Sequence, residues 1–361
     1  MKKILFFAFL SCILFISCGK DNSVNPPSVE TKFKGVFIVN EGLYGQNNST
    51  VSFYNPETEL VTNNVYEAAN PGINLGDNAN DIEVFGDKGY IAVDNSNKIE
   101  IINISTFKSL GSIDLGTNGS PRDIVIIDST IGYVTSLYKD KLIKFNPSTK
   151  QIIKEIEVGS KPEGAVYSAG KIYVANSGFS YNNSVSVVDI TTDIVEATLV
   201  VGDNPRFVHK GSDGNIYIVC SGKFDAVGKG GVYKINAQSN IVSDSVIINS
   251  NPGESCLILG NKMVVATNNG LLKVNLTNMT AEADVFISGL SINSLYGVIY
   301  SVVYNSKTEQ LYCGNPKDFQ QSGEIIIIDL NGTEIKRFEV GINPGTILIL
   351  NEINKKLELH K

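Results

Sequence analysis

The chain has 361 residues, of which 42% are hydrophobic and 19% charged, with 33 Gly, 11 Pro and no Trp. This balance excludes a disordered chain, a collagen-like repeat and a coiled coil, each of which has a far more biased composition. The formal net charge of −7 provides no basic field for a phosphate backbone, so we expect no nucleic-acid partner.

The N-terminus carries the features of an export signal. Two lysines precede an apolar run over 4–16, which is too short to span a bilayer and is typical of a secretory signal. The next residues, FISCG, resemble the lipobox of bacterial lipoproteins, in which the cysteine is acylated and becomes the new N-terminus. The resemblance implies a signal peptide over 1–17 and lipidation at Cys18; the alternative is an ordinary cysteine just past a conventional cleavage point.

Residues 18–34 are polar and contain a Pro-Pro pair, so we expect a lipidated cysteine followed by a flexible tether. Acyl chains of this kind anchor a protein stably without a membrane-spanning helix. We therefore predict an outer-membrane lipoprotein held by its lipid alone, on either the cell-surface or the periplasmic side.

Three cysteines remain beyond the predicted signal and anchor, at Cys220, Cys256 and Cys313. Each lies in an apolar, strand-like run, and their number is odd. Buried free thiols are the expected state, because the spacing suits neither a disulfide framework nor a metal site.

A repeat of about 43 residues determines the expected fold. The segment 160–202 contains four short runs rich in β-branched and aromatic residues, EGAVYS, KIYVANS, SVSVVDI and EATLVVG, separated by turn residues. Copies precede it over 75–116 and 117–159, and the closing glycines stand at 116, 159 and 202. Such a period is typical of four-stranded propeller blades.

The two ends of the repeat region complete the count. Residues 35–70 offer only a second, third and fourth strand (GVFIVNEG, TVSFYNP and LVTNNVY), whereas 342–350 (INPGTILIL) offer only a first strand. Joined in one sheet, they leave no open edge. We predict an all-β, seven-bladed β-propeller over 35–350, closed by this C-terminal strand and followed by a tail over 351–361.

The repeat units resemble the YVTN-repeat β-propeller family. The resemblance is carried by IYVANS at 172–177, SVSVVD at 184–189 and VGDNP at 201–205. It implies the fold much more specifically than the function, because propellers host many unrelated activities.

Two sets of loops are expected to share one face, namely the loops entering first strands and those joining second to third strands. The entry positions carry Asn80, Asp81, Arg122, Glu163, Arg206 and Tyr296. The joining loops, several of them long and rich in Gly and Asn, carry Tyr44, Tyr138, Phe179, Tyr181, Phe224 and Phe319. Turns on the opposite face, such as FGDKG and GSDG, are short, polar and almost free of aromatics, so we predict that a ligand binds the first face.

Structural roles for the same residues stay open. The aromatics can fold back and pack their own loops, and each arginine can simply pair with Asp123, Glu163 or Asp203. Two arginines at equivalent positions, in blades separated by one other, favour a ligand.

Catalytic motifs are sparse. The sequence has two histidines: His209 lies within a first strand, where we expect a wall residue, and His360 is next to the C-terminus. Neither a Ser-His-Asp triad nor a zinc site can readily be built from them. We therefore expect no enzymatic activity, no catalytic residue, no metal and no cofactor.

Three longer segments resemble surface lipoprotein propellers of Bacteroidetes: GVFIVNEGLYGQNNSTVSFYN, LGDNANDIEVFGDKGYIAV and YGVIYSVVYNSKTEQLYCGNPKDF. Members of that group capture cobalamin (vitamin B12) and pass it to a TonB-dependent outer-membrane transporter. The resemblance implies a non-catalytic protein that captures cobalamin and has such a transporter as a partner.

Two other functions remain open on the residues alone. One is a surface scaffold that uses the same face for protein interaction or adhesion. The other is a lactonase-like hydrolase, for which Glu163 and His209 are the candidate residues.

Overall fold

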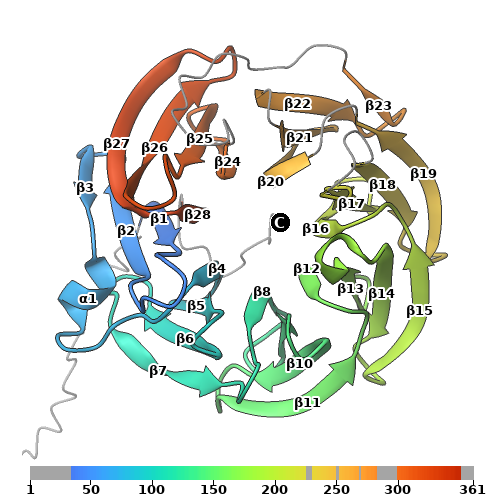
Figure 1. Ribbon diagram of the computed structural model, residues 1–361, viewed down its shortest axis with the longest axis horizontal. Coiled ribbons are helices and arrows are strands. Elements are labelled where there is room, and N and C mark those ends of the chain that lie inside the picture. Colours follow the sequence, from blue (N-terminus) through green and yellow to red (C-terminus); the bar gives the residue numbers. More distant parts are fainter. Residues whose placement is uncertain (1–33, 225–229, 249–251, 268–269, 283–298, 351–361) are drawn as a thin grey trace, which may run out of the picture. The chain divides into compact units, whose positions relative to one another are not determined.

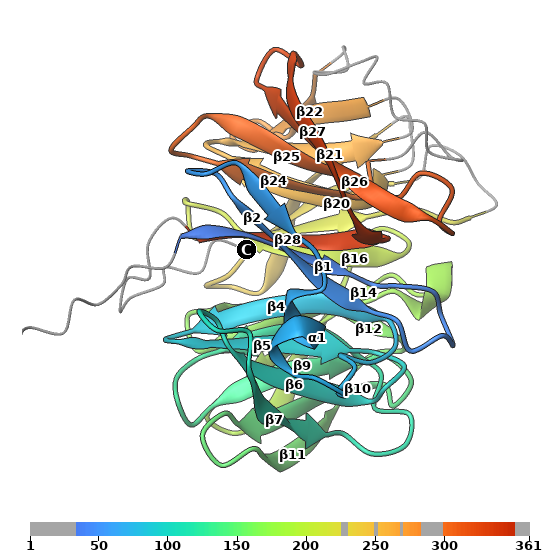
Figure 2. The ribbon, with the colours of Figure 1, turned by 90° about the vertical axis from the view of Figure 1, so that its left-hand side faces the viewer.

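The computed structural model describes residues 34–224, 230–248, 252–267, 270–282 and 299–350, without the side chain of Glu254. These residues form seven four-stranded antiparallel sheets. Figure 1 shows the sheets as blades around a common centre, and Figure 2 shows them from the side. The prediction of a seven-bladed β-propeller is confirmed.

The strands are grouped by their distance from the centre. The innermost strands are β4 (Ala79–Phe85), β8 (Pro121–Ile126), β12 (Pro162–Ser168), β16 (Pro205–Lys210), β20 (Pro252–Leu259), β24 (Ser301–Asn305) and β28 (Pro344–Leu350). The second strands are β1 (Gly35–Asn40), β5 (Lys88–Val93), β9 (Gly132–Ser136), β13 (Lys171–Asn176), β17 (Ile216–Cys220), β21 (Lys262–Thr267) and β25 (Gln310–Asn315). The third strands are β2 (Thr50–Asn55), β6 (Lys98–Asn103), β10 (Lys141–Asn146), β14 (Ser184–Asp189), β18 (Gly231–Asn236), β22 (Gly270–Asn275) and β26 (Ser322–Asp329). The outermost strands are β3 (Leu60–Thr62), β7 (Ser109–Asp114), β11 (Gln151–Glu157), β15 (Ile194–Val200), β19 (Ile241–Ile247), β23 (Thr280–Ala281) and β27 (Glu334–Ile342).

The ring is closed by the pairing of β28 with β1, as predicted. The two strands are antiparallel, with Gly35 opposite Leu350 and Val39 opposite Thr346. The last strand of the ring thus becomes the innermost strand of the blade that begins the chain. Pairing with β28 covers the inner edge of β1, and the blade has four strands like the other six.

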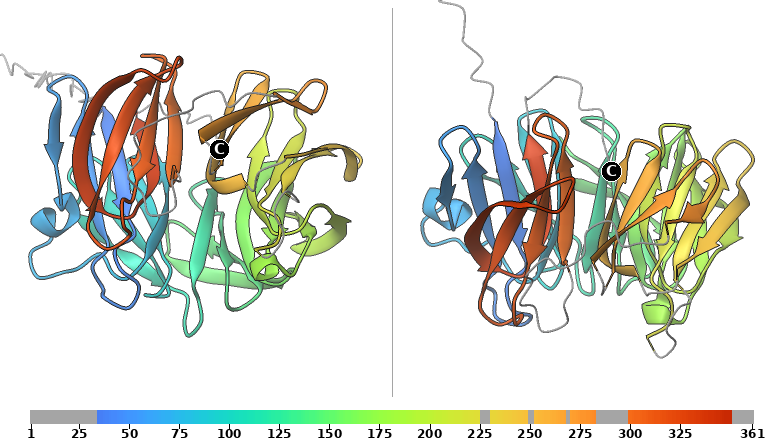
Figure 3. Two further views of the ribbon diagram at one scale, coloured as in Figure 1. Left: turned by 45° about the horizontal axis from the view of Figure 1, so that its top comes forward. Right: turned by 90° about the horizontal axis from the view of Figure 1, so that it is seen from above.

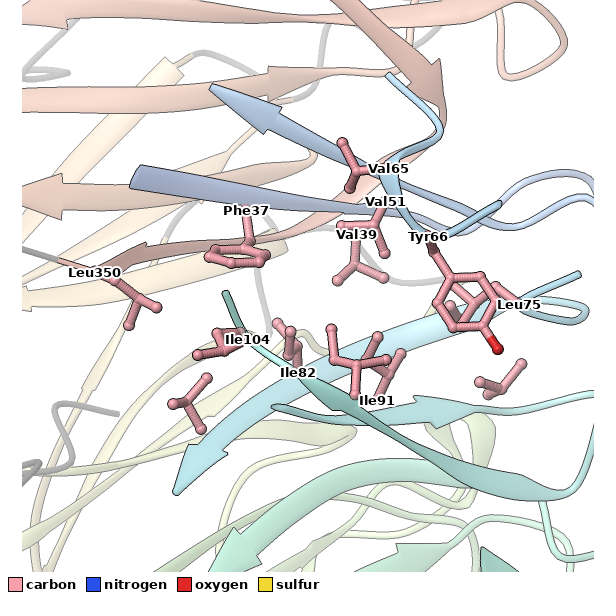
Figure 4. Close-up of a cluster of buried hydrophobic side chains, with 14 residues drawn as sticks. Phe37, Val39, Val51, Val65, Tyr66, Leu75, Ile82, Ile91, Ile104 and Leu350 are labelled. Carbon is pink, nitrogen blue, oxygen red and sulfur yellow. The ribbon is translucent and has the colours of Figure 1, made fainter. Parts of the chain in front are cut away.

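Apolar side chains fill the space between neighbouring blades. Because successive side chains of a strand point to opposite faces, β1 contributes to two such layers. Phe37 and Val39 pack toward β4 and β5 (Figure 4), whereas Val36 and Ile38 pack with Tyr312 and Ile325 of the neighbouring blade. Successive apolar residues of a strand therefore contribute to the hydrophobic cores on both sides of the sheet.

The first blade departs from the expected pattern in its fourth strand. The predicted strand LVTNNVY is divided into β3 and a short helix, α1 (Val65–Ala69). Asn64 has a left-handed backbone, with φ of 56°, and this turn ends the strand. Tyr66 is fully buried, and its hydroxyl donates a hydrogen bond to Glu100 Oε1 at 3.0 Å.

α1 also holds a buried carboxyl group whose burial is only partly compensated. Both carboxylate oxygens of Glu67 are buried and reach no hydrogen-bond partner in the part of the chain that the structure describes. Burial raises the pKa of Glu67, and the nearby backbone amides of Glu67 and Leu75 offset only part of this effect.

Across the described residues, no helix has both the length and the apolar character that crossing a membrane requires.

Shortening a side chain of the closing strand should lower the free energy of unfolding more than the same substitution on an outermost strand. Ile347 of β28 is 9% exposed and packs among Val36, Ile38 and Tyr54, so Ile347→Ala should lower the free energy of unfolding by about 2–4 kcal/mol. Ile335 of β27 is 51% exposed, and Ile335→Ala should change it by less than about 0.5 kcal/mol. Urea denaturation measures both, and equal losses would contradict a structural role for β28.

The pH dependence of Glu67→Gln should reveal the buried carboxyl. A raised pKa means that the folded protein binds this proton more strongly than the unfolded chain does, so its ionisation lowers stability as the pH rises. Glu67→Gln should therefore raise the free energy of unfolding at pH 7, and the gain should vanish as the pH approaches about 4. Glu309→Gln, at an exposed position, is the control and should show no such trend.

Candidate functional site

The two predicted sets of loops do lie on one face. In five blades, the residue before the innermost strand has a left-handed backbone, at Asn78, Ser120, Lys161, Asn204 and Asn343. The carbonyl of each accepts a hydrogen bond of 2.9–3.0 Å from the backbone N–H just after the second strand. In the right-hand view of Figure 3, the β1–β2 loop (blue) and the 3-10 helix η1 (Gly178–Ser180, yellow-green) lie at the same lower edge.

A register irregularity follows at the start of six innermost strands, those beginning at Ala79, Pro121, Pro162, Pro205, Pro252 and Pro344. Bulges of this kind redirect a side chain that regular pairing would place elsewhere. The residues at or next to these irregularities include Asn80, Arg122, Glu163, Arg206 and Gly345, which we call the mouth residues.

The mouth residues line a cavity of about 430 Å³ among the innermost strands, the central cavity. Its wall also includes Glu41, Asp81, His209, Cys256 and Tyr300. Of the entry positions predicted from sequence, Asn80, Asp81, Arg122, Glu163 and Arg206 are brought together here. Tyr296 lies outside the described residues.

Arg122 is the centre of an ionic network at the mouth. Its Nε donates to Glu163 Oε2 at 3.1 Å, and its Nη1 donates to Asn80 Oδ1 at 2.7 Å. The same Nη1 lies 3.3 Å from Asp94 Oδ2. One guanidinium group thus joins side chains from the two blades that flank its own.

The charges of this network stabilise each other. Burial alone would lower the pKa of Arg122, but the carboxylates of Glu163, Asp94 and Glu41 outweigh it and raise the pKa above its ordinary value. For Glu163, burial would raise the pKa, but the positive charges of Arg122 and Arg206 hold it below its ordinary value. Both groups are therefore ionised at neutral pH.

Asp81 has a different role from its neighbour Asn80. Its Oδ2 accepts a hydrogen bond of 3.0 Å from the backbone N–H of Ile124 in the next blade. Asp123 repeats this contact with Ala165 at 2.7 Å. These aspartates line the mouth, but their carboxylates also join adjacent innermost strands.

Opposite the arginines, the wall is formed by Glu41 and Tyr300. The hydroxyl of Tyr300 donates to Glu41 Oε2 at 2.8 Å. Phe319 lies behind this pair, with its ring edge-on to Tyr300 and the ring centroids 5.5 Å apart. Phe319 therefore packs within the site, as the alternative reading of the aromatics allows.

His209 and Cys256 occupy another part of the wall, with His209 Nε2 3.1 Å from Cys256 Sγ. Burial raises the pKa of Cys256, and the charge of Arg206 offsets little of this effect, so the thiol stays protonated. Cys220, Cys256 and Cys313 are all buried free thiols, which confirms that expectation.

Five of the six predicted loop aromatics are exposed around the mouth, and we call them the rim aromatics. Their exposed fractions are 66% for Tyr44, 47% for Tyr138, 40% for Phe179, 92% for Tyr181 and 81% for Phe224. Of the exposed aromatic side chains in the described residues, these five lie on this face and Phe85 lies on the opposite one, an asymmetry that favours a binding role for this face.

Two rim aromatics form a local cluster with a lysine. The ring centroids of Tyr138 and Phe179 are 6.1 Å apart, and Lys161 Nζ lies 5.8 Å and 6.0 Å from them. Phe179 has a left-handed backbone, with φ of 50°, which is costly for a bulky side chain. The loop thus holds this ring in place against its backbone preference.

Sequence reasoning missed Glu41, Asp94 and Tyr300 as parts of the site. Glu41 and Tyr300 are separated by 259 residues and meet only because the ring closes. Asp94 directly follows the second strand β5 and reaches Arg122 at the mouth. A polar residue at that recurrent position is the one signal that points to it.

Within the described ranges, no group of three or more His, Cys, Asp or Glu side chains is arranged to hold a metal ion.

Fold and site together define a β-propeller with a charged central cavity and an aromatic rim. Residues 34–343 match the family described as Domain of unknown function (DUF5074), and the chain belongs to this family. A comparison with curated proteins gives no match.

Solved structures with the same fold come from several bacteria. A quinoprotein alcohol dehydrogenase-like protein from Bacteroides thetaiotaomicron is 19% identical, with a TM-score of 0.67 over 89% of this chain and 80% of its own. A functionally unknown protein from Desulfotomaculum acetoxidans is 15% identical, with a TM-score of 0.67 over 89% of this chain and 100% of its own. Hydrazine synthase of Kuenenia stuttgartiensis is 18% identical, with a TM-score of 0.61 over 73% and 87%. At these identities the likeness concerns the fold.

Removal of Arg122 should destabilise the protein in a pH-dependent way. Arg122→Met leaves Asp94 mostly buried without its cation and Glu163 with the charge of Arg206 alone, which should cost about 3 kcal/mol of unfolding free energy at pH 7. Because the lowered pKa of Glu163 depends on Arg122, the loss should shrink as the pH falls toward about 4 and Glu163 takes up a proton.

Lys141→Met is the matched control, because the partner of Lys141, Glu157, is largely exposed. It should cost less than about 1 kcal/mol at either pH. Denaturant titrations at both pH values measure the two losses, and a loss for Arg122→Met that does not change with pH would contradict the ionic network.

Proposed function

We propose that this protein captures a bulky small molecule on the face formed by the mouth residues and the rim aromatics, without catalysing a reaction. The observation that carries the proposal is the concentration of exposed aromatic rings around a charged cavity. Aromatic rings supply a large apolar contact area, and polar groups in the cavity fix the orientation of a ligand.

The form of the site suits a broad ligand with apolar faces and polar edges. Tyr44, Tyr138 and Phe179 stand on separate loops around a cavity of about 430 Å³, which is too small for a large ligand to enter as a whole. Such a ligand would lie across the rim and place one edge group in the cavity. A corrin ring, apolar on its faces and fringed with amides, has this character, and the segments that resemble cobalamin-capturing lipoproteins suggest cobalamin itself.

Export, lipidation and transfer of the ligand belong to the same proposal. Cys18 and the tether lie outside the described residues, so the outer-membrane location still depends on the lipobox. A TonB-dependent transporter remains the partner that the resemblance implies.

The chemistry of the cavity favours binding over catalysis. Glu163, the candidate acid or base of a hydrolase, is bonded to Arg122, and its lowered pKa makes it a poor proton carrier at neutral pH. The raised pKa of Cys256 likewise disfavours a thiolate nucleophile.

Titration calorimetry of residues 19–361, which retain all seven blades, against cyanocobalamin tests the proposal. Tight one-to-one binding is expected. Phe179→Ala and Tyr138→Ala should each weaken it about ten-fold, because each removes an exposed aromatic contact worth more than about 1 kcal/mol. Phe85→Ala removes a partly exposed ring at the far end of β4, on the opposite face, and should leave affinity unchanged.

The other outcomes separate the alternatives. Absence of heat and of a thermal shift would reject cobalamin as the ligand and favour the protein-interaction scaffold. Binding that is insensitive to Phe179→Ala and Tyr138→Ala would reject the proposed face.

A further inference from the structure

The two arginines of the mouth suggest a site for anions. The central cavity as a whole, however, carries more negative than positive charge. Four carboxylates line it, those of Glu41, Asp81, Asp123 and Glu163, against the two guanidinium groups of Arg122 and Arg206. Asp94, in contact with Arg122, adds a fifth carboxylate. Negative charge therefore exceeds positive charge around the site.

Arg122 is already engaged by the protein. Its Nε and Nη1 are bonded to Glu163, Asp94 and Asn80, and the two carboxylates carry more charge than one guanidinium group. An incoming carboxylate or phosphate would have to compete with these buried partners, whose release is costly.

Arg206 lies in a similar environment. Its charge contributes to the lowered pKa of Glu163, which places it near that carboxylate, and its guanidinium carbon lies 5.3 Å from the centre of the Phe207 ring. Glu163 thus lies between two arginines and shares its negative charge with both.

We propose that the central cavity selects groups that are neutral or cationic and donate hydrogen bonds, such as primary carboxamides and ammonium groups, and repels carboxylates and phosphates. An ionised carboxylate is an acceptor without donors, whereas an amide N–H or an ammonium can bond to one. A concave wall with an excess of one charge also strengthens its field inside the cleft. This inference rests on the proposed function, because it specifies which edge of a captured ligand enters the cavity.

The reactivity of an introduced thiol with charged reagents tests the electrostatic field of the cavity without any ligand. Tyr138→Cys places a reporter at the rim, where the charges of Asp94 and Glu163 help to raise the pKa of the Tyr138 hydroxyl after the larger effect of burial, and Arg122 opposes them. Every variant also carries Lys161→Gln, because Lys161 Nζ lies 5.8 Å from the centre of the Tyr138 ring and does not belong to the cavity wall. Phe85→Cys places the control on the opposite face. Both are made in residues 19–361 and treated with methanethiosulfonates carrying either a trimethylammonium or a sulfonate group, and wild type corrects for the buried native thiols.

The ratio of the cationic to the anionic rate should be about ten-fold higher at position 138 than at position 85 in low salt. It should approach equality in high salt, which screens exposed charges. Equal ratios in low salt, or a ratio that favours the anionic reagent at position 138, would overturn the proposal. If Tyr138→Cys does not fold, Tyr44→Cys, at another exposed position of the same rim, is the reporter.

A second experiment, which compares ligands, distinguishes failure of this inference from failure of the capture proposal. Cyanocobalamin is compared with its monocarboxylate isomers, in each of which one peripheral carboxamide is hydrolysed. At least one isomer should bind about ten-fold more weakly in low salt, with the difference closing in high salt. Equal binding of all isomers overturns the inference and leaves capture intact, whereas no binding of any corrinoid, with the reactivity ratio preserved, overturns cobalamin capture and leaves the inference intact.

Discussion

The close approach of the innermost strands around one axis is the constraint on which the site depends. Neighbouring strands contact each other around the whole ring, so the residue at each contact must be small or must bond to the next backbone. Gly164 meets the requirement by size, because a Cβ there would lie 2.5 Å from the carbonyl oxygen of Arg206. Asp81 and Ser255 meet it by accepting backbone N–H groups, and Ser301 by donating to a carbonyl.

Because of this constraint, adjacent residues at the start of an innermost strand have different roles: one bonds to the next blade and the other faces the cavity. Asp81 joins blades while Asn80 bonds to Arg122, and Asp123 joins blades while Arg122 occupies the mouth. The bulge changes the directions that the strict alternation of a regular strand would give these two side chains. A change at the mouth position therefore alters the cavity and leaves the carboxylate-to-backbone bonds between blades in place, although at Arg122 it also removes side-chain bonds to both flanking blades.

Much of the fold could be predicted because each blade repeats the same local pattern. The predicted strand EGAVYS corresponds to β12, and INPGTILIL supplied the closing strand. Of the partners of Arg122, Glu163 was among the carboxylates considered from the sequence, but Asp94 of the other flanking blade was not. Tyr300 meets Glu41 only across the closure of the ring. Such pairings depend on the angular position of blades, which the repeat does not specify. α1 escaped prediction because a single left-handed residue, Asn64, redirects an apolar run.

The strained backbone of Phe179 connects the loops to the binding argument. A left-handed backbone such as that of Phe179 costs about 1–3 kcal/mol in a bulky residue, and it persists only where the surrounding structure imposes it. Here Ser177 Oγ accepts the N–H of Phe179, and the ring lies beside Tyr138 and Lys161. A ring held in this way loses little conformational freedom when a ligand covers it, so more of the contact energy remains as affinity. Contacts with residues next to the blades thus fix the exposed side chain of Phe179 in its loop.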